Sequence, residues 1–520
     1  MSGKRRIIYN NDGTFIFANG AHGKRPITRD DVRDYVDLVA GTPVTTFFIC
    51  TNSSMPYYHS RHERFLGSME GCKHLAGGDS PHPGDDSEKY GQAVTDLAAQ
   101  GLDIVSLVME RCREVGLEAM TSMRVNDLHF NERDKIYPHA QGEFWLDHPE
   151  YELGDAAIED WHSKGAFNFE HAAVREYKLN LLRESIERFA PDGHEMDFMR
   201  FPVYFPANKA RACCPIMTDF IRQSRAIVKD TARKSGQERF FGVRLPASVE
   251  ICNTIGLDPK AWCEEGLVDF ITVSAFFYDV PHLPLARFRN DLGSPELPIY
   301  AGLDHGVAEP RGGWGHFRAS AANRWRENPD GLYFFNFFYH TIDGVNLFYE
   351  TTDHQPAAIG ATRYGPSRAL LCELSDAARL RGRNKIYNAG SKKNCYGSDI
   401  TFDLPAEANG CVVEFRLPMA EGNVSPEEAI LFLRIAGAGQ NCDVTFNGVS
   451  CRKCDSDAGY YRLNEKLADG RRLIAFAVNP AQIKDGDNLV RVECPGAGSF
   501  SVERADCVVI HGPVETHGYF

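Results

Sequence analysis

Long apolar runs are absent from this 520-residue sequence, and so is the pattern of a secretory leader. No stretch of about 18 apolar residues occurs, so the sequence predicts no transmembrane helix. The first residues, "MSGKRRIIYNN", carry basic side chains but neither an apolar segment nor a small-residue cleavage site. We therefore expect a cytoplasmic protein, or a secreted or periplasmic one if a leader has been removed.

An excess of basic residues is also missing. The formal net charge is −14, with 57 Lys and Arg against 71 Asp and Glu, and no long basic run occurs. This balance argues against nucleic acid or an anionic membrane as the partner. It still allows a small anionic substrate, because a few arginines in a cleft can dominate the local field.

The 15 cysteines show neither the density of a disulfide framework nor the paired spacing of a zinc site. Cys213 and Cys214 are adjacent, and other cysteines lie inside apolar segments such as "TTFFIC", which favours buried reduced thiols. Cys451 and Cys454 form a lone CxxC with no second pair of ligands. We predict no metal site and no cofactor.

Short apolar runs alternate with amphipathic helical stretches up to about residue 340. The runs cover residues 6–10, 45–50, 118–124, 194–199, 240–245, 269–277, 298–303 and 331–338. Strands that alternate with helices predict parallel βαβ units, and this number of them predicts an α/β fold, a (β/α)8 TIM barrel over residues 1–375. A doubly wound sheet is the alternative, weakened because no Gly-rich phosphate loop follows any run.

From about residue 396 the sequence changes to short strands divided by turn signals such as Asn447-Gly448. This pattern predicts an all-β sandwich over residues 396–520, joined to the barrel by a linker at 376–395. The sandwich either binds sugar or packs on the barrel, and packing alone needs fewer assumptions. Residues 52–92 are rich in His, Gly and Pro, and we expect this insertion to form a lid over the C-terminal mouth of the barrel.

Polar side chains gather where the predicted strands end, which is where catalytic residues lie in a barrel. The segment "MTSMRVNDLHF" ends one strand with Arg124, Asn126, Asp127 and His129, a group that a core cannot bury cheaply. Other strand ends contribute Asp12, Thr51, Asn52, Glu195, Asp197, Arg200, Arg244, Glu250, Tyr278, Asp279, Asp304, His305, Asn336 and His340. The sequence therefore predicts one polar mouth.

Structural roles are open for several of these residues. Asp-Gly in "IIYNNDGTFIF" is typical of a hairpin turn, which would remove Asp12 from any site. Asp197 and Arg200 could form only a salt bridge with each other. Roles in the scaffold are equally open for His129, Arg244, Glu250 and Asp304.

Two reaction classes can be compared with these strand ends. A metal-dependent amidohydrolase needs an HxH motif at its first strand, which "YNND" lacks. A glycosidase of the usual kind needs two carboxylates. Asp197 together with Glu250, Asp279 or Asp304 could supply them, and spacing does not choose among the partners.

The segments "PDGHEMDFMRFP", "GLDPKAWCEEGLVDFITVSAFF" and "PIYAGL" resemble the glycosidase-like barrels related to family 10 glycoside hydrolases, over most of residues 100–345. "SMRVNDLHF", together with an Asp that ends the first strand, resembles glycoside hydrolase family 156, the inverting exo-sialidases. This resemblance implies a (β/α)8 barrel, a C-terminal β domain, a homodimer and sialylated glycans as substrates. It also implies that Asp12 and His129 form the catalytic pair, and that Arg124, Arg200 and Asn336 hold the substrate carboxylate.

The implied roles agree with elementary chemistry. Sialic acid carries a carboxylate on its anomeric carbon, and Arg offers a planar, two-pronged donor that matches it. A histidine with a pKa of about 6.5 can activate water at neutral pH, and a protonated Asp12, its pKa raised, would donate to the leaving oxygen. We expect Asn126, Asp127 and Asp197 to bind the substrate or orient these groups. The alternatives are a glycosidase for another acidic or sulfated sugar that uses Asp197, and a non-catalytic sugar-binding barrel.

Overall fold

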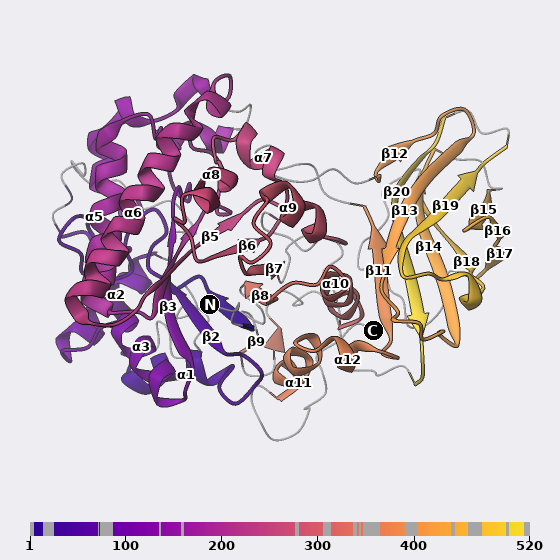
Figure 1. Cartoon of the computed structure of the whole chain (residues 1–520), viewed down its shortest axis with the longest axis horizontal. Helices are drawn as coiled ribbons and strands as arrows, with labels where there is room; N and C mark the ends of the chain where they lie inside the picture. Colours follow the sequence, from indigo (N-terminus) through magenta and orange to yellow (C-terminus); the bar gives the residue numbers. More distant parts are fainter. Residues whose placement is uncertain are drawn as a thin grey trace.

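The structure is a computed structural model of the chain, and it combines a barrel with a separate β domain (Figure 1). It describes residues 5–13, 25–70, 72, 87–134, 137–157, 161–275, 280–304, 314–335, 341–342, 345–346, 365–390, 403–437, 442–455, 471–495 and 499–513. Within these residues, no helix is long and apolar enough to cross a membrane.

Eight parallel strands close into a barrel in the order of the sequence, which confirms the predicted (β/α)8 fold. They are β1 (Ile8–Asn11), β2 (Thr46–Cys50), β3 (Glu118–Arg124), β4 (Gly193–Asp197), β5 (Phe240–Leu245), β6 (Phe270–Val273), β7 (Ile299–Asp304) and β8 (Gly331–Phe335). Both edges of β1 are occupied, by β2 and by β8. The hairpin alternative for Asp12 is therefore wrong, because Asp12 follows a barrel strand.

Side chains alternate between the barrel interior and the surrounding helices along each strand. Ile8, Phe48, Met120 and Phe270 pack together inside, with Tyr300 and Tyr333. The residues that alternate with these along the strands, such as Tyr9 and Phe47, belong to the large core between the barrel and the helices. The next interior position is polar on β1, β3 and β6, at Asn10, Ser122 and Thr272, so buried polar side chains begin one layer below the C-terminal mouth.

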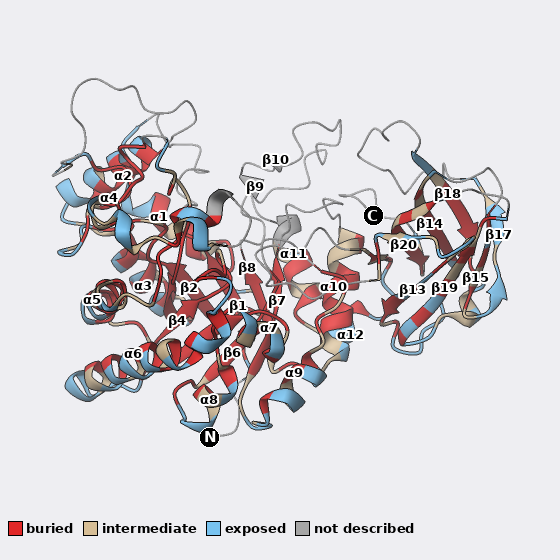
Figure 2. Cartoon of the chain, turned by 90° about the horizontal axis from the view of Figure 1, so that it is seen from above, coloured by how far each residue is buried: buried red, intermediate tan, exposed pale blue. Residues whose placement is uncertain are grey.

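Helices cover the outside of the barrel and turn their buried faces toward it (Figure 2). They are α1 (Arg29–Asp37), α2 (Ser87–Ala99), α3 (Ile104–Glu114), α4 (Glu143–Asp147), α5 (Ala172–Phe189), α6 (Cys214–Ser235), α7 (Val249–Thr254), α8 (Pro259–Glu264), α9 (Leu285–Leu292), α10 (Trp314–Arg326), α11 (Gly365–Leu374) and α12 (Ala377–Leu380). Local signals set their ends. The Asp103 carboxylate accepts from the Ser106 amide at the start of α3, and Gly236 ends α6 with φ +70°.

The C-terminal domain packs two antiparallel sheets over a common apolar core. One sheet contains β11 (Lys385–Ala389), β20 (Ser501–Ile510), β14 (Glu428–Ala436), β18 (Arg471–Ala477) and β17 (Arg452–Cys454), with β12 (Ala406–Glu407) beside β20. The other contains β13 (Val412–Met419), β19 (Gly486–Glu493), β15 (Asp443–Phe446) and β16 (Val449–Ser450). A separate pair, β9 (Thr341–Ile342) and β10 (Val345–Asn346), is antiparallel. The predicted β domain is thus confirmed.

Two details of the sequence-based description are wrong. The linker expected at 376–395 contains β11, which pairs with β20 from Lys385↔Val509 onward, so the sheet begins before the composition changes. The expectation of only reduced thiols fails for Cys442 and Cys494, which form a disulfide. The other described cysteines are free.

The predicted lid begins as a packed segment. Met55, Tyr57 and Tyr58 are buried, and the buried Glu63 carboxylate accepts from the backbone amides of Glu143 and Phe144. Residues 52–70 are therefore anchored to the barrel, while residues 73–86 lie outside the described part of the chain.

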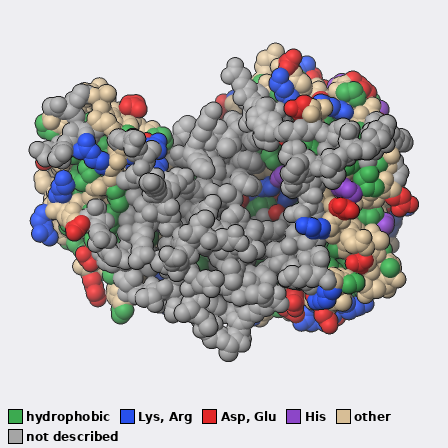
Figure 3. All heavy atoms as spheres, turned by 180° about the vertical axis from the view of Figure 1, so that it is seen from behind, with side chains coloured by type: hydrophobic (Ala, Val, Ile, Leu, Met, Phe, Trp, Pro, Cys, Tyr) green, Lys and Arg blue, Asp and Glu red, His purple; other side chains and the backbone are tan. Residues whose placement is uncertain are grey.

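The β domain contacts the barrel through α10. Ala319 of α10 belongs to the core of the β domain, and the buried Asn323 donates both to Pro281 O and to Pro418 O of β13, at 2.9 Å each. Beside this contact lies a cleft of about 380 Å³ between α9 and β13. Two ion pairs lie among its charged residues, Arg416–Asp403 and Arg287–Asp291. On the face shown in Figure 3, the described acidic and basic side chains are interspersed.

Candidate active site

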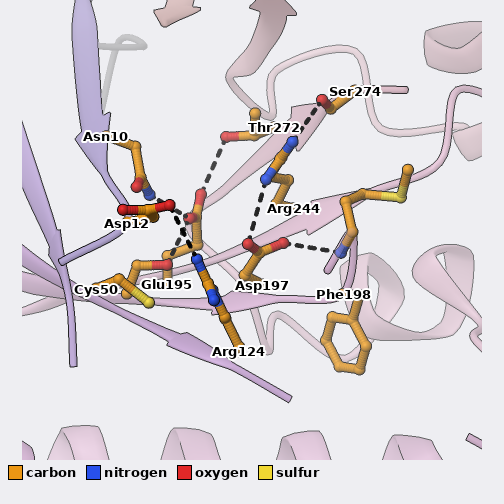
Figure 4. Close-up of polar contacts among 12 residues, drawn as sticks. Asn10, Asp12, Cys50, Arg124, Glu195, Asp197, Phe198, Arg244, Thr272 and Ser274 are labelled. Carbon is orange, nitrogen blue, oxygen red and sulfur yellow. Dashed lines mark hydrogen bonds and ion pairs between the residues drawn. The ribbon is translucent and has the colours of Figure 1, made fainter. Parts of the chain in front are cut away.

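The C-terminal ends of the barrel strands carry the cluster of charged residues that the sequence predicts. Arg124 lies at the end of β3, fully buried, and its Nη1 donates to Asp127 Oδ2 at 2.7 Å. Its Nη2 lies 3.4 Å from Asp12 Oδ2 (Figure 4). Arg124 Nε and Nη2 make no hydrogen bond with the described residues. The structure thus brings Asp12, Arg124 and Asp127 together from two neighbouring parts of the mouth.

Asp127 also holds His129. Its Oδ1 accepts from the backbone amide of His129 at 2.9 Å and contacts His129 Nδ1 at 2.7 Å. Burial opposes ionisation of Asp127, but the nearby charges of His129 and Arg124 outweigh it and hold the pKa of this carboxyl well below its usual range. Asp127 is therefore an anion at neutral pH that fixes one ring nitrogen of a histidine whose side chain is 38% exposed.

Arg200, in the loop after β4, is the second buried cation of this mouth. Burial lowers its pKa, and the charge of Arg124 lowers it further. Its guanidinium lies 5.6 Å from the centre of the Phe335 ring and 5.8 Å from that of Phe201. The mouth therefore buries two guanidinium groups close to each other, and the carboxylates of Asp127, Asp12 and Asp197 offset part of their repulsion.

The backbone next to His129 and Arg200 has an unusual conformation. Phe130 follows His129 with φ +66°, and Phe201 follows Arg200 with φ +59°. Bulky L-residues rarely adopt this region, and each such residue costs on the order of 1–3 kcal/mol. The Phe201 ring packs edge-on against His129, with centroids 5.0 Å apart. The fold thus retains local strain at the two positions that place the histidine and the second arginine.

Asn126 has a different position from the one that the sequence suggests. Its Nδ2 donates to Phe167 O and Val203 O, and its Oδ1 accepts from the Phe167 amide. The side chain is completely buried, so it ties two loops together behind the mouth rather than facing a substrate.

A second ion cluster lies beside the first, around Arg244 of β5. Its Nη1 donates to Asp197 Oδ2 at 3.2 Å, its Nη2 to Ser274 Oγ at 3.1 Å, and Asp304 Oδ2 is 3.8 Å away. Asp197 Oδ1 accepts from the Met199 amide. Asp197 thus pairs with Arg244 of the neighbouring strand, a partner that the sequence did not suggest. The guanidinium also lies over the Phe335 ring, at 4.2 Å.

Glu195 is the ionisable group whose importance the sequence analysis missed. It is fully buried below Asp197, and burial together with the charge of Asp197 raises its pKa to about 8. The available signal was the period of two in "HEMD", which turns Glu195 and Asp197 to the same interior face.

Other candidates lie elsewhere. Glu250 is on α7 with its side chain 67% exposed and paired with Arg211, so it is not a carboxylate of this mouth. Asn52 exchanges hydrogen bonds with the Arg124 backbone and Thr51 donates to Ser122 O, which makes both parts of the scaffold. Tyr278, Asp279, His305, Asn336 and His340 lie outside the described residues. In the described part of the chain, no group of three or more His, Cys, Asp or Glu could hold a metal ion.

No protein-family model and no curated protein matches the sequence. Solved structures of glycoside hydrolases resemble it at low identity. An α-amylase from Geobacillus thermoleovorans complexed with acarbose is 12% identical over 97% of this chain and 99% of its own, with a TM-score of 0.40. A putative α-L-fucosidase from Bacteroides thetaiotaomicron is 12% identical over 98% and 96%, with a TM-score of 0.34.

An α-galactosidase from Geobacillus stearothermophilus is 11% identical over 95% of this chain, with a TM-score of 0.35, and this chain spans 56% of its length. The barrel is established by its own strand pairing. These likenesses carry no argument about substrate or mechanism, which must come from the side chains at the mouth.

Proposed function

We propose that this protein is a glycoside hydrolase that removes terminal sialic acid from glycans with inversion at the anomeric carbon. The observation that carries the proposal is the pair of buried arginines, Arg124 and Arg200, beside the Asp127–His129 pair and Asp12. A sugar carboxylate would bind both guanidinium groups, whereas a neutral sugar would offer them no anion.

His129 is suited to activate water in a single displacement. The Asp127 anion engages Nδ1, which leaves Nε2 as the nitrogen that accepts a proton. The partial exposure of this side chain gives water access to it. Attack by that water on the anomeric carbon breaks the bond to the leaving oxygen, and the proton from water passes to His129.

Asp12 supplies the proton that the leaving oxygen takes up. In the ligand-free structure Asp12 lies 3.4 Å from Arg124, and a neighbouring cation favours the charged form of a carboxyl. A substrate carboxylate on Arg124 would weaken that preference, and Asp12 would then take up a proton. Binding of an acidic sugar should therefore be accompanied by proton uptake, and Asp12→Asn should abolish the uptake.

A glycosidase for another acidic sugar, with Asp197 as a catalytic carboxylate, is the second candidate. Both oxygens of Asp197 are engaged, by Arg244 and by the Met199 amide, which favours a role in holding the cluster. The arginines support both candidates equally, so the substrate decides between them. The homodimer implied by the family resemblance stays a prediction, checked by light scattering during gel filtration.

Proton NMR of the protein acting on α2,3-sialyllactose tests the proposal directly. We expect β-sialic acid as the first product, because direct water attack inverts the α-linkage. Early α-sialic acid would contradict the inverting mechanism. No release from several sialyl linkages would contradict the substrate, and uronic or sulfated sugars would then be assayed.

A variant separates an enzyme from a sugar-binding barrel. Asp12→Asn should still bind sialyllactose in calorimetry while turnover is lost. If Asp12→Asn kept both binding and turnover, Asp12 would have no role in the mechanism. Binding by the wild type without any turnover would identify a non-catalytic barrel.

A further inference from the structure

Tyr57 lies in the segment after β2 and packs against the residue that follows Asp12. The Tyr57 amide donates to Thr51 O at 2.9 Å, which ties this segment to the end of β2. A side chain at Gly13 would meet the Tyr57 ring, since a Cβ built there lies 2.5 Å from Tyr57 Cε2. The ring therefore lies directly on the backbone beside the proposed acid.

Two further contacts hold the ring and Gly13 in place. The rings of Tyr57 and of Tyr90 in α2 lie 5.3 Å apart, and the Tyr90 hydroxyl donates to Gly13 O at 3.4 Å. The Gly13 amide donates to Asn11 Oδ1 at 3.0 Å, and Gly13 has φ +82°. Few positions are open to a ring that is packed in this way, so the hydroxyl that it carries is fixed as well.

The Tyr57 hydroxyl is buried and makes no hydrogen bond with the described residues. The whole residue is only 1% exposed. A buried hydroxyl without a partner lowers stability. Phenylalanine would fill the same space without that cost, so packing alone does not account for a tyrosine at this position.

This hydroxyl lies among the charged groups of the mouth. Arg124 is the cation that acts on it most strongly, and Cys50, Asp12 and Asp127 are further ionisable groups whose charges reach it. Among the groups that favour the charge of Arg124, Tyr57 comes first. Burial raises the pKa of the Tyr57 hydroxyl well above its usual range, so it is a neutral hydrogen-bond donor at neutral pH.

Arg124 and Tyr57 together offer donors to one ligand. Arg124 Nε and Nη2 also make no hydrogen bond with the described residues. Such donors fit a carboxylate, because its two oxygens only accept hydrogen bonds and its charge strengthens each of them. A sugar hydroxyl accepts through one uncharged oxygen, so it is the weaker ligand for this pair.

From these contacts we infer that Tyr57 is a further substrate-binding residue, whose hydroxyl donates to the same sugar carboxylate that Arg124 binds. The identity of the sugar as sialic acid rests on the proposed function. The role of Tyr57 applies equally to a uronic acid, because that sugar carries the same group.

Tyr57→Phe tests the inference with little risk to the fold, because the ring stays. Calorimetry with N-acetylneuraminic acid, the expected product, should show a Kd raised about tenfold by the loss of one hydrogen bond to a charged group. The kcat/KM for α2,3-sialyllactose should fall by a similar factor, mostly through KM. Urea unfolding should show a stability equal to or above that of the wild type, because a buried hydroxyl without a partner has been removed.

Tyr58→Phe is the matched control. This neighbouring tyrosine is also buried, but its ring packs edge-on against Phe189 of α5, with centroids 4.9 Å apart. The affinity of this variant for N-acetylneuraminic acid should equal that of the wild type. Equal affinities in Tyr57→Phe and Tyr58→Phe would overturn the inference. Weaker binding by Tyr57→Phe together with a clear loss of stability would also overturn it, because that result is expected of a structural hydroxyl.

Glucuronic acid separates this inference from the proposed function. If the wild type hydrolyses no sialoside but binds glucuronic acid, and Tyr57→Phe binds it less tightly, the proposed function fails and the role of Tyr57 stands. If Tyr57→Phe hydrolyses sialyllactose as well as the wild type does, the proposed function stands and the role of Tyr57 fails. Binding of neither acid by the wild type would overturn both.

Discussion

Buried arginines occur at both ends of the barrel interior, but the hydrogen bonds of their guanidinium groups differ. At the N-terminal end, the Arg6 guanidinium donates to Glu118 at 2.6 and 3.1 Å and to Tyr300 OH at 2.9 Å. At the C-terminal end, Arg124 leaves Nε and Nη2 without a hydrogen bond to the described residues, and Arg200 lies near enough to be affected by its charge.

The pKa of Arg200 is lowered, whereas the pKa values of Arg6 and of Arg124 are both raised. Burial disfavours the charge of Arg6, but Glu118 and Tyr300 outweigh burial and raise its pKa. Burial and the charge of Arg124 lower the pKa of Arg200. Arg6 has a complete set of hydrogen-bond partners at one end of the barrel, whereas at the other end two guanidinium groups lie close together, beside Asp12 and Asp127. We propose that this difference separates a structural ion pair from a binding site within one barrel.

The largest expected effect is on catalysis at the C-terminal end. Arg124→Met should lower kcat/KM by about 100- to 1000-fold, because truncating one member of a buried charge pair costs about 2–5 kcal/mol. Arg124→Lys, the matched control, keeps the charge but lacks the two-pronged donor and should lose less. The measurement is sialyllactose hydrolysis by both variants. Activity equal to wild type in Arg124→Met would remove this arginine from the binding site.

The counterpart at the N-terminal end should affect stability instead. Arg6→Met leaves the partly buried Glu118 without its cation, so we expect the free energy of unfolding to fall by about 3 kcal/mol. The kcat/KM of the remaining folded protein should stay near the wild-type value. Urea unfolding and kinetics, measured on the same preparations, compare the effects of the two arginines. A loss of activity without a loss of stability in Arg6→Met would contradict a purely structural role for Arg6.

The sequence predicted the barrel and most of the mouth because both depend on local patterns. The runs at 118–124 and 240–245 coincide with β3 and β5, and the polar residues after each strand identified Arg124 and His129. The pairing of Asp197 with Arg244 was not predictable. It depends on the register between β4 and β5, which brings two residues 47 positions apart side by side.

At Glu195 and Asn126 the structure also differs from what the sequence predicted, for the same physical reason. Glu195 looked like one more strand-end carboxyl, because its raised pKa follows from burial and from Asp197, and its hydrogen bonds come from hydroxyl groups on three other strands. Asn126 lies within the most polar segment of the sequence, and only the tertiary structure shows that backbone groups of two distant loops occupy its amide. The type of a residue and its position along a strand can be read from the local sequence. Its hydrogen-bond partners cannot, because they come from distant parts of the chain.

Glu195 lies between the two ends of the barrel interior, and we expect it to make the free energy of unfolding depend on pH. The folded protein keeps Glu195 protonated up to about pH 8, whereas the unfolded chain releases this proton near pH ~4.3. The folded state binds more protons in this window, so the contribution of Glu195 to stability is lost as pH rises from about 4.3 to 8. Glu195→Gln should show a flatter profile in urea unfolding at several pH values, and parallel profiles would contradict the raised pKa of Glu195.

The smallest effects come from removing single hydroxyl groups at the two ends. Thr46 Oγ1 donates to Glu118 at 2.8 Å, and Ser274 Oγ accepts from Arg244 at 3.1 Å. Thr46→Val should lower the free energy of unfolding by about 1.5 kcal/mol and leave kcat/KM unchanged. Ser274→Ala should lower kcat/KM about fivefold, equivalent to about 1 kcal/mol, with a smaller change in stability. Each variant loses one hydroxyl beside a buried arginine, so equal stability losses and equal activities would show that the two ends do not differ in function.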